Sequence, residues 1–295
     1  FEFLYPLYFP SISKLLLVGD PRQLGPVIKW VGFSNYQPNE TSLFVNFYER
    51  LQREDELRII VLRKQYRLRK SVAEFVSAIA YNDQQGVMEQ AETGNWEKTL
   101  SLPEICVFSG DSWEEKKADC TFSHENHKEM VFGLKLLEAS MKQAGFNFHT
   151  KQWSATATPL KYAIISLYQG QVSLFTRSIK QLGLQEFVRV STVDQMQGSE
   201  VDVAIVSAVR GSTDESVSVG FADDLRRLTV ALSRAACVYV LAKYSSFKSE
   251  IGWQKLYQLA ARHQRVITNA DSFETVESIF LLLQSFSANP ISDDQ

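Results

Sequence analysis

The second half of the sequence contains four consecutive patterned runs: YAIIS at residues 162–166, VSLFTRSIKQL at 172–182, VRVSTV at 188–193 and VDVAIVSAV at 201–209. The first, third and fourth runs are short, apolar and rich in β-branched residues, which is typical of strands buried on both faces. The second run repeats its apolar residues at helical spacing. Strands that alternate with helices predict an α/β fold, in which a parallel sheet is covered by helices on both faces.

The same alternation extends outward from this region. In open parallel sheets ligands bind beyond the carboxyl ends of the strands, so polar residues next to strands are candidates for a binding site. The segment from Asp83 to Thr158 is less regular and holds most of the Trp residues, so we interpret part of it as an insertion or a long surface connection. We expect further strands at 14–18, 58–62, 105–108 and 236–241, and further helices at 43–51, 72–79, 130–141, 226–235 and 276–283.

Composition places the chain among ordinary globular proteins. Its 295 residues are 45% hydrophobic and 22% charged, and this length suits about two domains. The net charge of −3 excludes a protein that holds nucleic acid by bulk positive charge alone, although a local basic groove remains open. Three Cys residues without a close pair do not form a disulfide framework.

Two polar segments in the first quarter of the chain follow predicted strands. Residues 19–26 read Gly-Asp-Pro-Arg-Gln-Leu-Gly-Pro, and residues 63–70 read Arg-Lys-Gln-Tyr-Arg-Leu-Arg-Lys. The second segment has five basic residues among eight and no acid, which suits a phosphate. Taken alone, the first segment equally fits a strand-to-loop turn, and the second equally fits a solvated helix start.

Two further segments lie in the second half of the chain. Residues 191–202 offer hydroxyl, amide and carboxylate groups that could bind a sugar or a phosphate. Residues 224–235 include the helix predicted at 226–235, on which Arg227 and Arg234 are seven positions apart and share a face. Alone, these segments fit a polar crossover loop and an amphipathic helix with solvated arginines.

In this order, the four segments resemble the signature motifs of superfamily 1 helicases, and the group that contains the nonsense-mediated-decay helicase and senataxin most closely. The Gly-Asp-Pro-x-Gln-Leu-x-Pro segment resembles motif III, and residues 65–67 resemble motif IV, with Leu68 in place of the usual Met. Residues 192–200 resemble motif V and residues 227–235 resemble motif VI. Tyr168 and Gln171 match a weaker family position, although Leu167 replaces the usual Pro.

The resemblance implies a role for each matching residue. The implied catalytic residues are Gln23, which would sense the γ-phosphate, and Arg67 and Arg234, which would act as arginine fingers. Glu200 would bind the nucleotide ribose, and Gly198 would allow close approach. The other implied nucleotide-binding residues are Gln65, Tyr66 and Arg227, and the residues that would couple the nucleotide cleft to the nucleic acid are Thr192, Asp194 and Gln197.

The resemblance also implies the domain organisation. The fold would be RecA-like, the fold of P-loop NTPase helicases. Residues 1–62 would be the C-terminal remnant of the first RecA-like domain, residues 63–245 the second such domain, and residues 246–295 a helical tail. The positive charge would be concentrated at Arg63–Lys70 and Arg226–Arg234.

Two elements of a helicase motor do not occur in the sequence. There is no Gly-x-x-x-x-Gly-Lys-Ser/Thr loop and no Asp-Glu pair at the end of a predicted strand. The family places that pair at or just before Phe1, and the chain does not begin with Met. We therefore expect truncation, with the first domain upstream, and no ATPase activity from this chain alone. A degenerate helicase that does not hydrolyse ATP is the alternative.

These expectations name the cofactor and the partners. ATP with Mg²⁺ is the expected cofactor, with the Mg²⁺ ligands upstream of this chain, and the expected partners are that upstream domain and single-stranded nucleic acid, with RNA slightly favoured over DNA. We expect no membrane span and no metal site, because Cys120, His124 and His127 lack a fourth ligand at a recognised spacing. The cytoplasm or the nucleus is the expected location. Two functions remain open: the motor half of an ATP-dependent helicase, or a helicase-shaped scaffold that binds nucleic acid or protein without turnover.

Overall fold

The chain divides into two compact units, Phe1–Leu62 and Arg63–Gln295. This computed structural model describes residues 9–25, 43–53, 59–81, 89–91, 94–118, 123–212 and 219–291.

The first unit contains helix α2 (Leu43–Arg53) and a tight turn at Asp20. The Asp20 carboxylate accepts hydrogen bonds from the Arg22 backbone N–H and from the Gln23 side-chain amide, each at 2.9 Å. A Cβ atom at position 19 would lie 2.9 Å from the Phe44 ring. Gly19 therefore allows the chain to pass close to α2.

The strands expected at 14–18 and 58–62 are not formed in the described part of these segments; residue 58 lies outside it. Leu16 and Ile60 are 85% and 82% exposed, so neither segment is buried. An extended segment becomes a strand only when a neighbouring strand pairs with its backbone, and the described residues of the first unit contain no strand.

A six-stranded sheet forms the centre of the second unit, and its strands pair in the order β12-β3-β11-β10-β8-β9. Every neighbouring pair in this sheet is parallel, which confirms the predicted α/β class. The strand bounds are β3 Ile105–Phe108, β8 Tyr162–Ser166, β9 Val188–Thr192, β10 Val201–Ser207, β11 Ala235–Leu241 and β12 Val266–Ile267.

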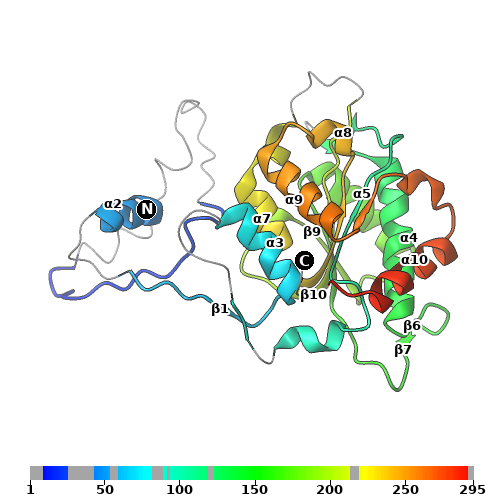
Figure 1. Ribbon diagram of the computed structural model, residues 1–295, viewed down its shortest axis with the longest axis horizontal. Helices are drawn as coiled ribbons and strands as arrows, with labels where there is room; N and C mark the ends of the chain where they lie inside the picture. The colour runs from blue at the N-terminus through cyan, green and yellow to red at the C-terminus, as the bar shows by residue number, and fades with distance from the viewer. Residues whose placement is uncertain are drawn as a thin grey trace. The chain divides into compact units, whose positions relative to one another are not determined.

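Helices cover both faces of this sheet (Figure 1). One face carries α4 (His127–Gln143), α5 (Gln169–Gln181) and, packed on α4, α10 (Val276–Ala288). The other face carries α3 (Lys70–Ala80), α7 (Leu225–Leu232) and α9 (Ile251–Arg262). The core on the α4 side joins apolar side chains of the central strands to those of the helices, among them Ile205, Tyr239, Leu136, Phe175 and Leu283.

The irregular segment 83–158 contributes directly to the sheet. Strand β3 lies between β12 and β11, and Trp113 is buried in the core at 1% exposure. The interpretation of this segment as an insertion therefore applies only to its short pieces. These are β2 (Glu89–Gln90), which pairs with β1 (Lys64–Gln65), the 3-10 helix η2 (Asn95–Thr99), and the small pairs β4–β5 (Lys116–Lys117, His124–Glu125) and β6–β7 (Phe146–Asn147, Gln152–Trp153).

The tail at residues 246–295, which was expected to be helical, also contains a strand. Besides α8 (Tyr244–Phe247), α9, the 3-10 helix η4 (Ala270–Ser272) and α10, it supplies strand β12, which pairs with β3 at the edge of the sheet. Among the described residues, no helix has the length and apolar character needed to cross a membrane.

Candidate functional site

Arg67 connects three of the segments singled out in the sequence. Its Nε atom donates to Glu200 Oε2 at 2.9 Å, and its Nη1 atom donates to the Ser233 carbonyl at 3.0 Å. Arg67 comes from the motif IV segment, Glu200 from motif V and Ser233 from motif VI. The arginine side chain is 35% exposed and that of Glu200 is 53% exposed, so solvent reaches the pair. The three motifs therefore meet at one accessible charged cluster.

Gln65 holds the turn that presents Arg67. Its Oε1 atom accepts hydrogen bonds from the backbone N–H groups of Arg67 at 3.0 Å and Leu68 at 2.6 Å, and its Nε2 atom donates to the Leu68 carbonyl at 2.9 Å. The Gln65 amide thus stabilises the local backbone. Tyr66, between them, is 60% exposed.

Arg234 lies beside this cluster but is only 3% exposed. Its Nε atom donates to the Val230 carbonyl at 2.9 Å, Nη2 donates to Ser233 Oγ at 2.7 Å, and Nη1 reaches the Ser199 carbonyl at 3.4 Å. Motif VI is therefore bound to motif V through the side chain of Arg234.

The cluster lies at the amino edge of the sheet, whereas the sequence led us to expect the carboxyl edge. Glu200 directly precedes β10, and Arg234 directly precedes β11, which is parallel to β10. Both residues therefore stand where these strands begin. The general rule for open parallel sheets describes loops that leave strands, but Glu200 and Arg234 lie on chain segments that run up to strands. Thr192, at the other end of motif V, is the last residue of β9 and lies at the carboxyl edge.

Arg227 is held by two carboxylates. It donates to Asp224 Oδ2 at 2.8 Å and to Asp194 Oδ1 at 3.3 Å. Asp224 also caps α7 by accepting the Arg226 backbone N–H at 2.9 Å. Asp224 was not predicted as a site residue, although an Asp just before a helix is a recognisable capping signal.

Thr192 begins the short helix α6 (Val193–Met196), which follows β9. Its hydroxyl accepts from the Gln195 backbone N–H at 3.3 Å, and the Gln195 side chain accepts from the Thr192 backbone N–H at 3.2 Å. This reciprocal pair is a capping box. Gln197 ends the helix, and Gly198 follows with a φ of 77°, a conformation that glycine adopts without strain.

The remaining predicted catalytic residue, Gln23, belongs to the first unit, where its amide donates to Asp20. Within the second unit, the structure brings Arg67, Glu200 and Arg234 into one cluster, and it pairs Arg227 with Asp194.

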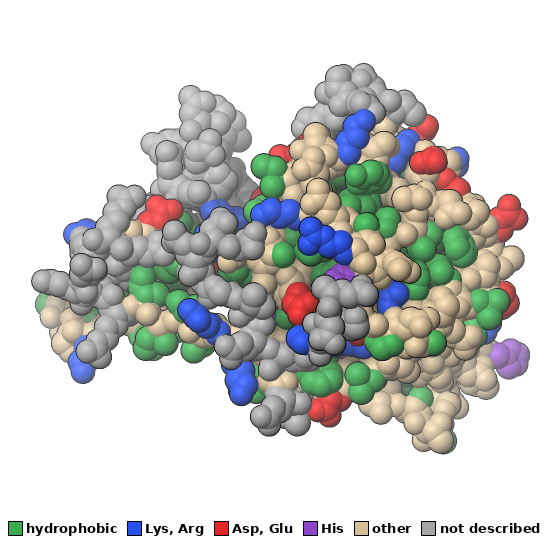
Figure 2. Space-filling model, in the orientation of Figure 1, with side chains coloured by type: hydrophobic (Ala, Val, Ile, Leu, Met, Phe, Trp, Pro, Cys, Tyr) green, Lys and Arg blue, Asp and Glu red, His purple; other side chains and the backbone are tan. Residues whose placement is uncertain are grey.

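The basic segment 63–70 is less available to phosphate than its composition indicates. Arg69 is 8% exposed and forms a buried ion pair with Glu104, so its charge faces the interior. Arg67 is paired with Glu200. On the face visible in Figure 2, Lys and Arg side chains are interspersed with polar and apolar ones.

A second polar cluster lies at the carboxyl edge of the sheet, and of its members the sequence had singled out only Gln171. Glu129 is fully buried in the first turn of α4 and accepts hydrogen bonds from Ser207 Oγ and from the Val209 backbone N–H. Asn126 donates to the Val209 carbonyl at 3.0 Å, and the buried Gln171 links Asn126 to Ser207.

This cluster combines an unusual backbone turn at Val209 with a raised pKa at Glu129. Val209 has a φ of 72°, which is strained for a β-branched residue, and the Arg210 N–H closes a γ-turn onto the Ala208 carbonyl at 2.8 Å. Burial raises the pKa of Glu129 to about 8, although its hydrogen bonds from Ser207 and Val209 act in the opposite direction.

The two histidines near Cys120, which the sequence did not favour as metal ligands, contact other side chains. His127 bonds to Glu125 at 3.1 Å, and His124 packs edge-on against Tyr168. Cys120 lies outside the described residues. Among the residues that the structure describes, no group of three or more His, Cys, Asp or Glu side chains is placed to hold a metal ion.

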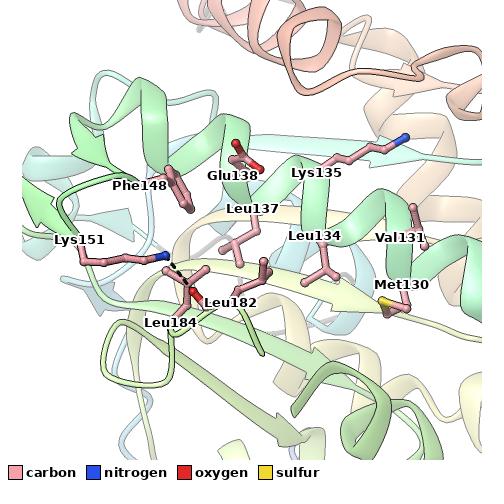
Figure 3. A pocket seen from close by; sticks show the side chains of 10 residues that line it. All are labelled: Met130, Val131, Leu134, Lys135, Leu137, Glu138, Phe148, Lys151, Leu182 and Leu184. Carbon is pink, nitrogen blue, oxygen red and sulfur yellow. Dashed lines mark hydrogen bonds between the residues drawn. The ribbon is translucent and has the colours of Figure 1, made fainter. Parts of the chain in front are cut away.

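An apolar pocket opens beside α4 (Figure 3). Lys151 closes one end by donating to the Leu182 carbonyl at 2.8 Å. A mostly apolar lining does not suit a nucleoside triphosphate. None of the predicted site residues contributes to this pocket. The lining residues are Met130, Val131, Leu134, Lys135, Leu137, Glu138, Phe148, Lys151, Leu182 and Leu184.

Residues 40–244 match the family model described as an AAA domain, which is more than half of the chain. The chain belongs to this family. It is similar to probable helicase MAGATAMA 3 of Arabidopsis thaliana, with 28% identity over 91% of this chain and 32% of the relative. It is also similar to human probable helicase senataxin, with 26% identity over 88% of this chain and 10% of the relative, and to helicase SEN1 of Saccharomyces cerevisiae, with 28% identity over 83% and 11%.

These relatives confirm the resemblance to superfamily 1 helicases that the motifs indicated, and family membership together with the parallel sheet identifies the fold as RecA-like. The chain spans a third or less of the length of these three relatives.

Proposed function

We propose that this chain supplies the second motor half of an ATP-dependent helicase or translocase that acts on single-stranded nucleic acid. The observation that carries the proposal is the position of Arg67, which joins motifs IV, V and VI at one solvent-accessible cluster. Phosphoryl transfer requires positioned positive charge, and a guanidinium remains charged and can grip phosphate with two nitrogens.

The residues present fit a nucleotide at this cluster. Arg67 Nη2 has no hydrogen-bond partner among the described residues, and the Glu200 carboxylate is accessible and chemically suited to a ribose hydroxyl. When bound, ATP with Mg²⁺ supplies the transferable phosphoryl group. Arg67 would then stabilise the developing charge, Glu200 would orient the sugar, and motif V would couple the site to the strand.

Part of the motor is expected from outside the 295 residues. The sequence has no Gly-x-x-x-x-Gly-Lys-Ser/Thr loop, so we propose that the phosphate-cradling loop and the Mg²⁺ ligands come from a separate RecA-like domain of the same protein. The arginines would then act only when the two domains close on the nucleotide.

The test is nucleic-acid-stimulated ATP turnover by the full-length protein. Arg67→Ala should lower kcat by about 10³-fold or more while ATP binding is retained, because an arginine finger acts mainly in the transition state. Arg177→Ala is the matched control, since Arg177 is an exposed arginine on α5 that lies on the opposite face of the sheet from α3, and it should leave turnover unchanged.

Single-stranded RNA and DNA of matched sequence should be compared as stimulators, and we expect RNA to stimulate more. Absence of turnover with either strand, in a protein that still binds nucleic acid, would favour the scaffold instead. Equal loss of ATP binding and turnover in Arg67→Ala would contradict the finger role.

A further inference from the structure

We propose that Arg69 and Glu104 are positioning residues that set Arg67 in place for catalysis, an inference that rests on the proposed function. Arg69 is only two positions after Arg67, yet the two guanidinium groups have opposite environments. Arg67 is partly exposed at the amino edge of the sheet, whereas Arg69 is 8% exposed and points into the unit. One arginine can therefore contact a ligand, and the other anchors the segment.

The segment that carries Arg67 has little regular structure of its own. Strand β1 has only two residues and pairs with another two-residue strand. Helix α3 begins only at Lys70, and its N-cap residue, Arg69, makes no side-chain capping bond. The Gln65 amide fixes the shape of the turn, but it does not tie the turn to the sheet.

The Arg69 side chain provides that tie. Its Nη1 atom donates to the Leu102 carbonyl at 2.6 Å and to the Thr99 carbonyl at 3.1 Å, and its Nη2 atom donates to Glu104. Glu104 directly precedes β3, and its backbone carbonyl accepts the Val238 N–H of β11 at 2.8 Å. The guanidinium thus joins the start of α3 to the amino edge of the two neighbouring strands β3 and β11.

The carbonyls that receive Arg69 are themselves fixed. Thr99 ends η2, and Lys98 in the same helix forms a 2.7 Å ion pair with Asp202 at the start of β10. Strands β10 and β11 are the two that Glu200 and Arg234 precede. The anchor and the cluster that Arg67 enters are therefore attached to the same edge, which fixes the distance between them.

The anchor is specific to a planar, forked donor. Arg69 uses two terminal nitrogens in two directions, which a lysine ammonium on a flexible stem cannot reproduce. Displacements of about 1 Å at a catalytic group lower rates by about a hundredfold even when the mutated residue lies away from the reaction. Loss of the anchor should therefore reduce kcat more than substrate binding.

The experiment uses the full-length protein with Arg69→Met combined with Glu104→Leu. Replacing both members of a buried ion pair by apolar residues of similar size commonly preserves folding, whereas removing one member leaves an unpaired buried charge. We expect this double variant to fold, with a thermal midpoint only a few degrees below that of the wild type, because the Leu102 and Thr99 carbonyls lose a donor. We expect kcat for ATP to fall by about tenfold or more, with KM changed by less than about twofold.

Three comparisons make the result decisive. Arg265→Met removes another buried arginine, which contacts the Phe286 carbonyl and not the motif IV segment, and it should leave kcat unchanged. Arg69→Lys with Glu104 intact keeps a cation beside Glu104 but not the bonds to both carbonyls, so it should recover only part of the kcat lost in the double variant. The complex of ADP with aluminium fluoride, a transition-state mimic, should bind more weakly to the double variant and to Arg67→Ala, while ATP affinity is kept.

A folded double variant with wild-type kcat would overturn the positioning role, and so would parallel losses of kcat, ATP affinity and thermal stability. If Arg67→Ala loses turnover while the double variant keeps it, the positioning role alone is wrong. Absence of strand-stimulated turnover in the wild type would overturn the proposed function and this inference with it.

Discussion

At the scale of single residues, burial gives Glu129 a raised pKa that its sequence context does not predict. Nothing in the sequence around His127–Met130 marks this acid as unusual, because an acid in the first turn of a helix is common. The fold encloses it completely, with one carboxylate oxygen left without a partner among the described residues. Desolvation then raises its pKa to about 8, so it holds a proton at neutral pH.

This shift makes stability depend on pH. The folded chain retains the Glu129 proton up to about pH 8, whereas the unfolded chain loses it near 4.5. Between these values the folded state binds one more proton, so the free energy of unfolding falls as pH rises, by at most about 1.4 kcal/mol per pH unit. Glu129→Gln cannot ionise, and we expect it to remove this contribution.

Denaturant unfolding of wild type and Glu129→Gln between pH 5 and 8 measures the difference. The variant should gain stability relative to the wild type as pH rises through this window. A constant difference across the window would show that Glu129 does not hold a proton in the folded state.

The pair Arg67 and Arg69 shows what the sequence could predict at this scale. Motif resemblance selected Arg67, and the structure places it in an accessible cluster with Glu200. No local signal separates Arg69 from its basic neighbours, because its inward orientation depends on Glu104, which is 35 positions away.

At the scale of elements, α10 illustrates how the tail is held. Its apolar residues recur at helical spacing, so the sequence predicted a helix at 276–283, and the structure extends it to Ala288. Thr275 caps the helix by accepting the Ser278 N–H at 3.1 Å. The buried side chains Ile279 and Leu283 pack into the core beside α4, whereas Leu281 is 65% exposed.

Leu283→Ala should therefore destabilise the second unit by about 2–5 kcal/mol, because it leaves a cavity in a closed core. Leu281→Ala, on the same helix, should change stability by less than about 0.5 kcal/mol. Chemical denaturation monitored by circular dichroism compares the two. Equal effects would mean that α10 does not pack as the structure shows.

At this scale the sequence missed strand β12. Its two residues are too few to give a periodic pattern, and they form a strand only because β3 offers its backbone for pairing. The opposite error occurred at 14–18 and 58–62, where apolar patterns predicted strands but the described residues of the first unit contain no partner strand.

At the scale of the whole molecule, the two units carry different parts of the proposed chemistry. Gln23 lies in the first unit, and Arg67, Glu200 and Arg234 lie in the second. None of these groups can replace the lysine and the metal ligands that would bind and polarise the phosphates in the proposed motor.

We therefore expect the isolated 295-residue chain to show no ATP turnover, even with saturating single-stranded nucleic acid. A phosphate-release assay checks this, with the full-length protein as the positive control. Turnover that depends on Gln23 or Arg234 in the isolated chain would contradict the expectation.

The sequence by itself determined the α/β class, the sheet strands β3, β8, β9, β10 and β11, and the helicase motifs. Hydrophobic periodicity and motif spacing are local properties of the chain. The tertiary structure decided that the motif cluster lies at the amino edge, that Arg69 is an anchor, and that Glu129 is a buried acid beside a strained turn. These features depend on contacts between residues far apart in sequence, and burial and pairing, which set their energies, exist only after the chain has folded.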